Sequence, residues 1–214
     1  TTQVSQFSSD QIVALSTAQI QALTAGQVAS LTSGQLNGMA SDDLQALTTN
    51  QIKALTTDQI SDLSSEQVQQ LQTAQVAALS SAQVEKLSTS AIASLTTDQV
   101  KVLSTAALNA LTSDQLAALE TDDVAALTTL QVNKLSTAQL SKLSTDQIEA
   151  LGTGQVQALS TAQVASLTSA QLNGMASDDL QALTTTQIKA LTTGQISDLS
   201  SDQVKLLQLS LIHI

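Results

Sequence analysis

The sequence predicts an all-α solenoid, a superhelix of very short N-capped helices with one helix per eight-residue repeat. Three observations lead to this prediction. Residues 8–207 divide into 25 octads without insertion or deletion, each close to Ser/Thr-Thr-x-Gln-Ile/Val-x-Ala-Leu. Position 5 is Ile, Val or Leu in all 25, and position 8 is Leu except at Met39 and Met175. Position 1 is Ser or Thr in 20 octads and position 4 is Gln in 20, which is the spacing of a capping box.

The octad predicts where each helix begins. In the second octad, Ser16 is the expected N-cap, and Gln19 is then the third helical residue, whose amide reaches back to the cap. Leu15 and Ile20 fall at the two positions of a hydrophobic staple, which fixes how the chain enters the helix. Each helix is therefore expected to span about six residues. Aspartates at octad position 3 fall in the first turn, where they oppose the positive helix end: Asp10, Asp58, Asp98, Asp114 and Asp146.

Other repeat architectures fit the octad poorly. In one continuous helix the apolar stripe would rotate by about 80° per octad and circle the helix, and the period does not match a coiled coil. A β-solenoid would show alternation with period two. Burial of one Leu or Ile, about 1.5–3 kcal/mol, outweighs a cap of about 1 kcal/mol. We therefore expect positions 5 and 8 to point inward, with a few octads per coil. Ala91 and Ala107 replace the position-4 Gln and indicate that this position tolerates its loss.

Composition excludes several function classes. The 214 residues carry 7 Lys+Arg against 18 Asp+Glu, a net charge of −11, so no nucleic-acid partner is expected because phosphates require a basic surface. The acidic chain is also unsuited to anionic membranes, and no apolar run approaches the length of a membrane span. The sequence has no Cys, Pro, Trp or Tyr, which excludes disulfides and thiolate metal sites. The residues shown open inside a repeat and not with a signal peptide, so any such signal is expected to lie upstream of them.

The octad register predicts one continuous solenoid over residues 1–208. Residues 1–7 form an octad that lacks its first residue, with Val4 and Phe7 at the two apolar positions. Neither terminal octad has the polar capping unit that seals solenoids. We therefore expect end-to-end self-association through the exposed apolar ends.

No catalytic, cofactor-binding or metal-binding residue is predicted, and the chain is not expected to be an enzyme or to take a small-molecule substrate. The sole histidine is His213, so a Ser-His-Asp triad has no credible base. Consecutive aspartates could serve acid/base chemistry or bind calcium, but they fit better as first-turn residues at helix starts: Asp42-Asp43, Asp122-Asp123 and Asp178-Asp179.

Two further features allow a binding interpretation. Asn37-Gly38 and Asn173-Gly174 indicate either a local kink or binding notch, or tolerated variation, and we favour tolerated variation. The two sites are equivalent, because residues 36–49 recur identically at 172–185. The Ser/Thr residues at positions 1 and 2 form regular columns that suit a glycan, ice or another surface. Capping accounts for position 1 and simple exposure for position 2, which is the interpretation we favour.

The octads TTDQISDL, TTDQVKVL and STAQVASL resemble the octapeptide arrays of very long bacterial surface or secreted proteins, over residues 1–207. The resemblance implies a non-catalytic structural segment (stalk, spacer or scaffold) that is extracellular or at the cell surface, and it carries no functional residues. The alternative is a binding module that uses the Ser/Thr/Gln columns for a glycan, ice or a protein partner.

The last six residues, Leu-Ser-Leu-Ile-His-Ile at 209–214, break the octad. They resemble a translation of the transposase mosaic-end adapter used in sequencing libraries. The resemblance implies that 209–214 is a non-native tail from adapter read-through, and that the chain is a metagenomic-type contig fragment of a longer array.

Overall fold

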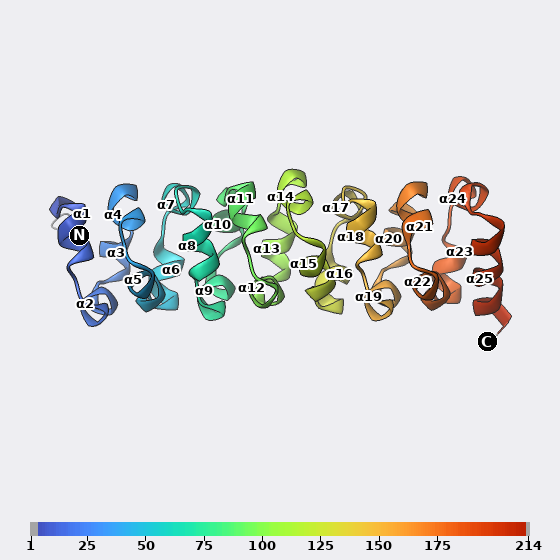
Figure 1. Cartoon of the computed structure of the whole chain (residues 1–214), viewed down its shortest axis with the longest axis horizontal. Helices are drawn as coiled ribbons and strands as arrows, with labels where there is room; N and C mark the ends of the chain where they lie inside the picture. Colours follow the sequence, from blue (N-terminus) through green and yellow to red (C-terminus); the bar gives the residue numbers. More distant parts are fainter. Residues whose placement is uncertain (1–3, 213–214) are drawn as a thin grey trace. The chain divides into compact units, whose positions relative to one another are not determined.

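The structure is a computed structural model that describes the backbone of residues 4–212 and the side chains of residues 4–207. The described residues form short helices and no strands (Figure 1). They divide into two compact units, Thr1–Ala118 and Leu119–Ile214. The predicted all-α fold with one helix per octad is confirmed.

The first unit begins with a 3-10 turn, η1 (Val4–Gln6), and continues through fourteen α-helices. Their bounds are α1 (Ser9–Val13), α2 (Thr17–Ala22), α3 (Ala25–Val28), α4 (Ser33–Asn37), α5 (Ser41–Ala46), α6 (Thr49–Ala54), α7 (Thr57–Ser61), α8 (Ser65–Gln70), α9 (Thr73–Ala78), α10 (Ser81–Lys86), α11 (Thr89–Ala93), α12 (Thr97–Val102), α13 (Thr105–Ala110) and α14 (Ser113–Ala117).

The second unit holds the remaining eleven helices. Their bounds are α15 (Thr121–Ala126), α16 (Thr129–Lys134), α17 (Thr137–Leu140), α18 (Thr145–Glu149), α19 (Thr153–Ala158), α20 (Thr161–Ser166), α21 (Ser169–Gly174), α22 (Ser177–Ala182), α23 (Thr185–Lys189), α24 (Thr193–Asp198) and α25 (Ser201–Ile212).

The helices begin where the octad predicts. Ser16 has extended backbone and caps α2, because its hydroxyl accepts the Gln19 N–H at 3.4 Å while Gln19 Oε1 accepts the Ser16 N–H at 2.9 Å. The same reciprocal pair recurs in most octads, as at Thr56 and Gln59. The five position-3 aspartates named above lie in the first turns of α1, α7, α12, α14 and α18, as expected.

Octads that depart from the consensus keep only part of this cap. Before α9 and α19, the backbone N–H groups of Gln72 and Gly152 still donate to a Gln side chain, without a hydroxyl in return. In α11 and α13 the Ser hydroxyl caps the N–H of Ala91 or Ala107 alone. The helices α5, α15 and α22, which follow Ala40, Glu120 and Ala176, have no side-chain cap.

Positions 5 and 8 form the core, as predicted. Ile52 and Leu55, for example, are 0% and 4% exposed, and both methionines occupy the same buried column as the leucines they replace. Within each unit a helix packs on the one three octads along, as α7, α10 and α13 do. Hydrogen bonds from position 4 reach four octads back. One coil therefore holds more than three and fewer than four octads, in agreement with the few expected.

The last helix differs from the others in length. Helices α1–α24 have four to six residues, whereas α25 has twelve. Gln208 occupies octad position 1 and Leu211 occupies position 4, so neither half of a capping box is present to interrupt the helix after Leu207. Among the described residues, no helix combines the length and apolarity needed to cross a bilayer.

Candidate functional site

The position-4 glutamine makes a contact that the octad pattern alone did not reveal. Its Oε1 accepts the N–H of its own N-cap, and its Nε2 donates to the carbonyls of positions 5 and 8 in the octad four earlier. We call this arrangement the Gln bridge. Within the two units it is formed by Gln35, Gln51, Gln59, Gln75, Gln83, Gln99, Gln115, Gln155, Gln163, Gln171, Gln187 and Gln195, and Gln147 makes the position-8 half.

Gln163 illustrates the bridge. Its Oε1 lies 2.8 Å from the Ser160 N, and its Nε2 lies 2.9 Å from the Val132 carbonyl oxygen and 2.8 Å from that of Leu135. The side chain is 2% exposed. Buried polar groups require such partners, so the amide ties each coil to the previous one. The expectation that this Gln serves capping alone was incomplete. Because the bridging side chains are buried, the Gln column is also not the binding surface that the alternative function invoked.

Five octads replace this Gln with a side chain that cannot bridge. Ala91 and Ala107 have no polar group and are 0% and 1% exposed. Asp43, Asp123 and Asp179 are buried, at 7%, 3% and 5% exposed. An ionised aspartate can only accept hydrogen bonds, so it offers no donor for the carbonyls that a Gln would reach. Among the described side chains, Asp123 Oδ2 is a buried oxygen without a hydrogen-bond partner.

Burial raises the pKa of two of these carboxyls. For Asp123, desolvation is the largest cause; a hydrogen bond from the Glu120 backbone opposes it, and the charges of Glu120 and Asp122 add to it. For Asp179, desolvation raises the pKa and the neighbouring charge of Asp178 raises it further. A raised pKa means that the folded chain binds more protons than the unfolded chain between the ordinary aspartate value and the raised one. The free energy of unfolding therefore falls as the pH rises through that window.

Asp179→Gln is expected to raise the free energy of unfolding at pH 7 by about 1–3 kcal/mol, since each new internal hydrogen bond contributes about 1 kcal/mol and the buried charge is removed. In the octad register, the new amide reaches the carbonyls of Ile148 and Leu151. Urea unfolding followed by circular dichroism measures the difference. The advantage should shrink as the pH falls below the Asp179 pKa, because the protonated aspartate no longer carries the charge penalty.

Asp146→Asn serves as the control, because Asp146 is an exposed first-turn carboxylate of α18. It removes the same charge without adding a bridge and is expected to leave stability within about 0.5 kcal/mol. An Asp179→Gln variant no more stable than this control would contradict the bridge model.

The paired aspartates occupy helix starts, as predicted. Each pair lies in the first turn of one helix, α5, α15 or α22. The first member of each pair is exposed and the second is the buried position-4 residue. Among the described residues, no cluster of His, Cys, Asp and Glu has metal-binding geometry. His213 lies outside the described residues.

The Ser/Thr side chains of positions 1 and 2 have different environments, as the sequence suggested. Position-1 hydroxyls accept the N–H three residues on and are committed to capping, as at Ser80 and Thr128. Position-2 side chains lie at the surface, with Thr129 exposed and Thr97 half-buried. A surface available to a ligand therefore draws on position 2 and not on position 1.

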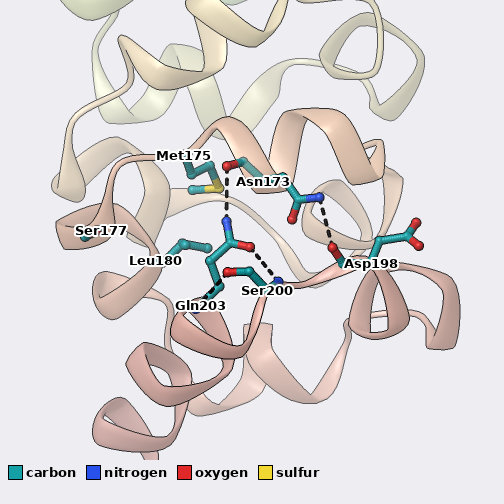
Figure 2. Close-up of a pocket in the computed structure, with 7 residues that line it drawn as sticks. All are labelled: Asn173, Met175, Ser177, Leu180, Asp198, Ser200 and Gln203. Atoms are coloured by element: carbon teal, nitrogen blue, oxygen red, sulfur yellow. Dashed lines mark hydrogen bonds between the residues drawn. The ribbon is translucent and has the colours of Figure 1, made fainter.

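One notch in the second unit is lined by side chains from two neighbouring coils. A cavity of about 510 Å³ is bounded by Asn173 and Met175 on one coil and by Asp198 and Gln203 on the next, and Leu180 also lines it (Figure 2). The Asn173 Nδ2 donates to the Asp198 carbonyl at 3.1 Å, and the Gln203 Nε2 donates to the Asn173 carbonyl at 3.1 Å. This amide bonds the position-6 carbonyl of the earlier octad, a carbonyl that several Gln bridges also reach in addition to positions 5 and 8, as Gln99 does. Asn173 belongs to one of the two Asn-Gly sites noted in the sequence, and this site borders the hollow.

Comparison with known proteins identifies the family to which the repeats belong. A family model described as the ALTTAQ repeat matches the chain nine times, at 4–41, 36–73, 68–105, 94–121, 100–129, 116–153, 129–161, 148–177 and 172–208. No curated protein matches the chain. The successive matches cover the whole octad array, with the capping and bridging geometry described above, and the chain belongs to the ALTTAQ repeat family.

Proposed function

We propose that the chain is a structural segment, a non-catalytic stalk, spacer or scaffold within a larger bacterial surface or secreted protein. The observation that carries the proposal is the Gln bridge, which repeats the same coil-to-coil contact along each unit. Each coil contacts its neighbours, so stability is a sum of near-neighbour terms and length can change without redesign.

Small-angle X-ray scattering of the 214-residue chain tests the spacer. A compact globule of this length has a radius of gyration of about 17 Å, and an extended spacer should exceed that value clearly. Removing eight octads, residues 64–127, deletes whole repeats and preserves the register. The radius of gyration should then fall roughly in proportion to length. A compact value for the full chain would contradict the proposal.

Self-association end to end is the expected behaviour of this chain at high concentration. Exposed apolar side chains lie in the first coil, with Phe7 and Val13 each 43% exposed, and in the last, with Ile196 at 51% and Val204 at 37%. Because Gln bridges run in one direction, the two terminal coils present different groups, amide donors at the first and carbonyl acceptors at the last. Contacts between unlike surfaces are head-to-tail and build open chains. Light scattering should give a mean mass that rises with concentration, and a strict monomer throughout would contradict the expectation.

The location at the cell surface or outside the cell and the adapter origin of residues 209–214 are part of the same proposal. The absence of Cys is compatible with an oxidising environment. The uninterrupted helix α25 supports a departure from the octad after Leu207, since a further octad would supply a cap at position 1. Sequencing reads that continue with octads past Gln208 would support the adapter origin, and reads that encode 209–214 in the genome would refute it.

A further inference from the structure

The two apolar columns of the array face in opposite directions along it. In the first coil (α1–α3), the position-5 side chains are closed although no full coil precedes them within the chain: Ile12 and Ile20 are 0% exposed. The position-8 side chains of the same two octads are more open, because Leu15 and Leu23 are half-buried. Position 5 therefore packs toward the following coil, and position 8 packs toward the preceding one.

The last coil (α23–α25) shows the opposite pattern. Its position-5 residues Ile196 and Val204 are 51% and 37% exposed, whereas its position-8 residues Leu191 and Leu207 are 8% and 6% exposed; Leu199 between them is half-buried. Helix α25 also packs against α23, so the open part of this surface lies on α24 and α25. The first coil thus exposes the column that receives a preceding coil, and the last coil exposes the column that receives a following one.

The polar groups of the two end surfaces are complementary as well. Gln19 and Gln27 use Oε1 to accept the N–H of their own caps, and neither has a described hydrogen bond from Nε2. Gln19 is exposed and Gln27 is half-buried, whereas the bridging Gln163 is buried. At the other end, the carbonyls of Ile196 and Leu199 lie where a Gln four octads later would bond, and the sequence has no octad at that place. One end therefore has spare amide donors and the other has spare carbonyl acceptors.

We propose that the first coil of one chain docks on the last coil of a second copy, with Gln19 and Gln27 forming Gln bridges across the contact. In the octad register, the Gln19 amide reaches the carbonyls of Ile196 and Leu199, and the Gln27 amide reaches the corresponding pair one octad later. The open position-8 leucines of the first coil then cover the open position-5 side chains of the last.

A second copy is the occupant because this contact continues the interface that joins successive coils inside the chain, and both halves of that interface are present on one molecule. The inference rests on the head-to-tail association proposed above and names the groups that carry it. A contact between two like ends would set amide donors against amide donors and leave them unpaired, at a cost when they are buried. The register therefore favours open oligomers over closed dimers.

Two variants, each disabled at one end, test the proposal. Gln19→Glu combined with Gln27→Glu removes the donors of the first coil, while the new carboxylates can still accept the cap N–H groups, as in a Ser/Thr-x-x-Glu capping box. Ile196→Glu places a charge in the open apolar surface of the last coil. In sedimentation velocity, each variant alone should stay monomeric at concentrations where the parent forms oligomers. An equimolar mixture should form a dimer and nothing larger, because one intact first coil meets one intact last coil.

Leu130→Glu is the matched control. Leu130 is 59% exposed in α16, outside both terminal coils, and the variant adds the same charge in place of an exposed apolar side chain. It should form oligomers as the parent does. Circular dichroism should give the parent's helix content for all variants, because Gln19 and Ile196 are exposed and Gln27 is half-buried.

Several outcomes would overturn the proposal. They are a parent chain that stays monomeric, an end variant that still forms oligomers alone, and a mixture that stays monomeric. Loss of association in Leu130→Glu would also overturn it, since exposed apolar surface in general would then drive association. X-ray scattering of the dilute monomer still tests the spacer, so failure of the docking and failure of the spacer are distinguished.

Discussion

Replacing Gln99 by alanine is expected to lower the free energy of unfolding by about 2–4 kcal/mol, which is among the largest effects of any polar substitution in this chain. Gln99 is 2% exposed. Its Oε1 accepts the Thr96 N–H at 2.9 Å, and its Nε2 donates to the carbonyls of Val68 and Leu71 at 3.1 and 2.7 Å. Removing one partner leaves buried groups unsatisfied, at about 1–3 kcal/mol each.

The neighbouring octads amplify this effect. The octads on either side of Gln99 carry Ala91 and Ala107 at position 4, so the variant would have three consecutive octads without a bridge. Gln19→Ala is the matched control, because Gln19 is exposed and its described bonds are to the cap at Ser16. It should cost about 1 kcal/mol, the usual value of a cap. Urea unfolding followed by circular dichroism measures both variants, and equal effects would refute an energetic role for the coil-to-coil bonds.

The octad predicts the local structure well because its signals are local. The hydroxyl of Ser16 and the amide of Gln19 act within one turn of the chain, so spacing alone identified them. The Gln bridge joins residues 28 and 31 positions apart. That distance depends on how the chain turns between helices. The turn is set by extended residues such as Leu23 (φ −62°, ψ 136°) and Thr24 (φ −69°, ψ 155°).

The effects of the substitutions at position 4 also depend on contacts between coils, which the octad pattern alone does not predict. In the sequence, Ala91 and Ala107 indicate that the Gln is dispensable, because a cap can be lost at small cost. In the structure, Ala91 and Ala107 are single positions without a Gln bridge, and the octad between them forms one through Gln99. The aspartates at this position were correctly placed at helix starts, but their burial depends on the previous coil. Asp123 and Asp179 thus acquire raised pKa values for a reason that no local pattern contains. The notch likewise combines residues as far apart as Asn173 and Gln203.

Leu116→Asp is expected to be the most destabilising single substitution considered, at more than about 4 kcal/mol. Leu116 occupies position 5 in α14 and is 1% exposed. The variant forfeits about 1.5–3 kcal/mol of hydrophobic burial and places a carboxylate among apolar side chains, where an unpaired charge is costly. Because contacts are between neighbouring coils, the damage should concentrate in the coils around α14. Amide hydrogen exchange should therefore accelerate there more than at α6.

Leu130→Asp provides the control with the same change of side chain. Leu130 is 59% exposed and lies in the first turn of α16, at octad position 3, which aspartate takes in nine other octads. A carboxylate there opposes the positive helix end and contributes about 0.3–1 kcal/mol of stabilisation. The two leucine-to-aspartate variants should thus shift the urea midpoint in opposite directions. If Leu116→Asp were as well tolerated as Leu130→Asp, position 5 would not be the core of the array, and the inward-facing arrangement on which the coil depends would be wrong.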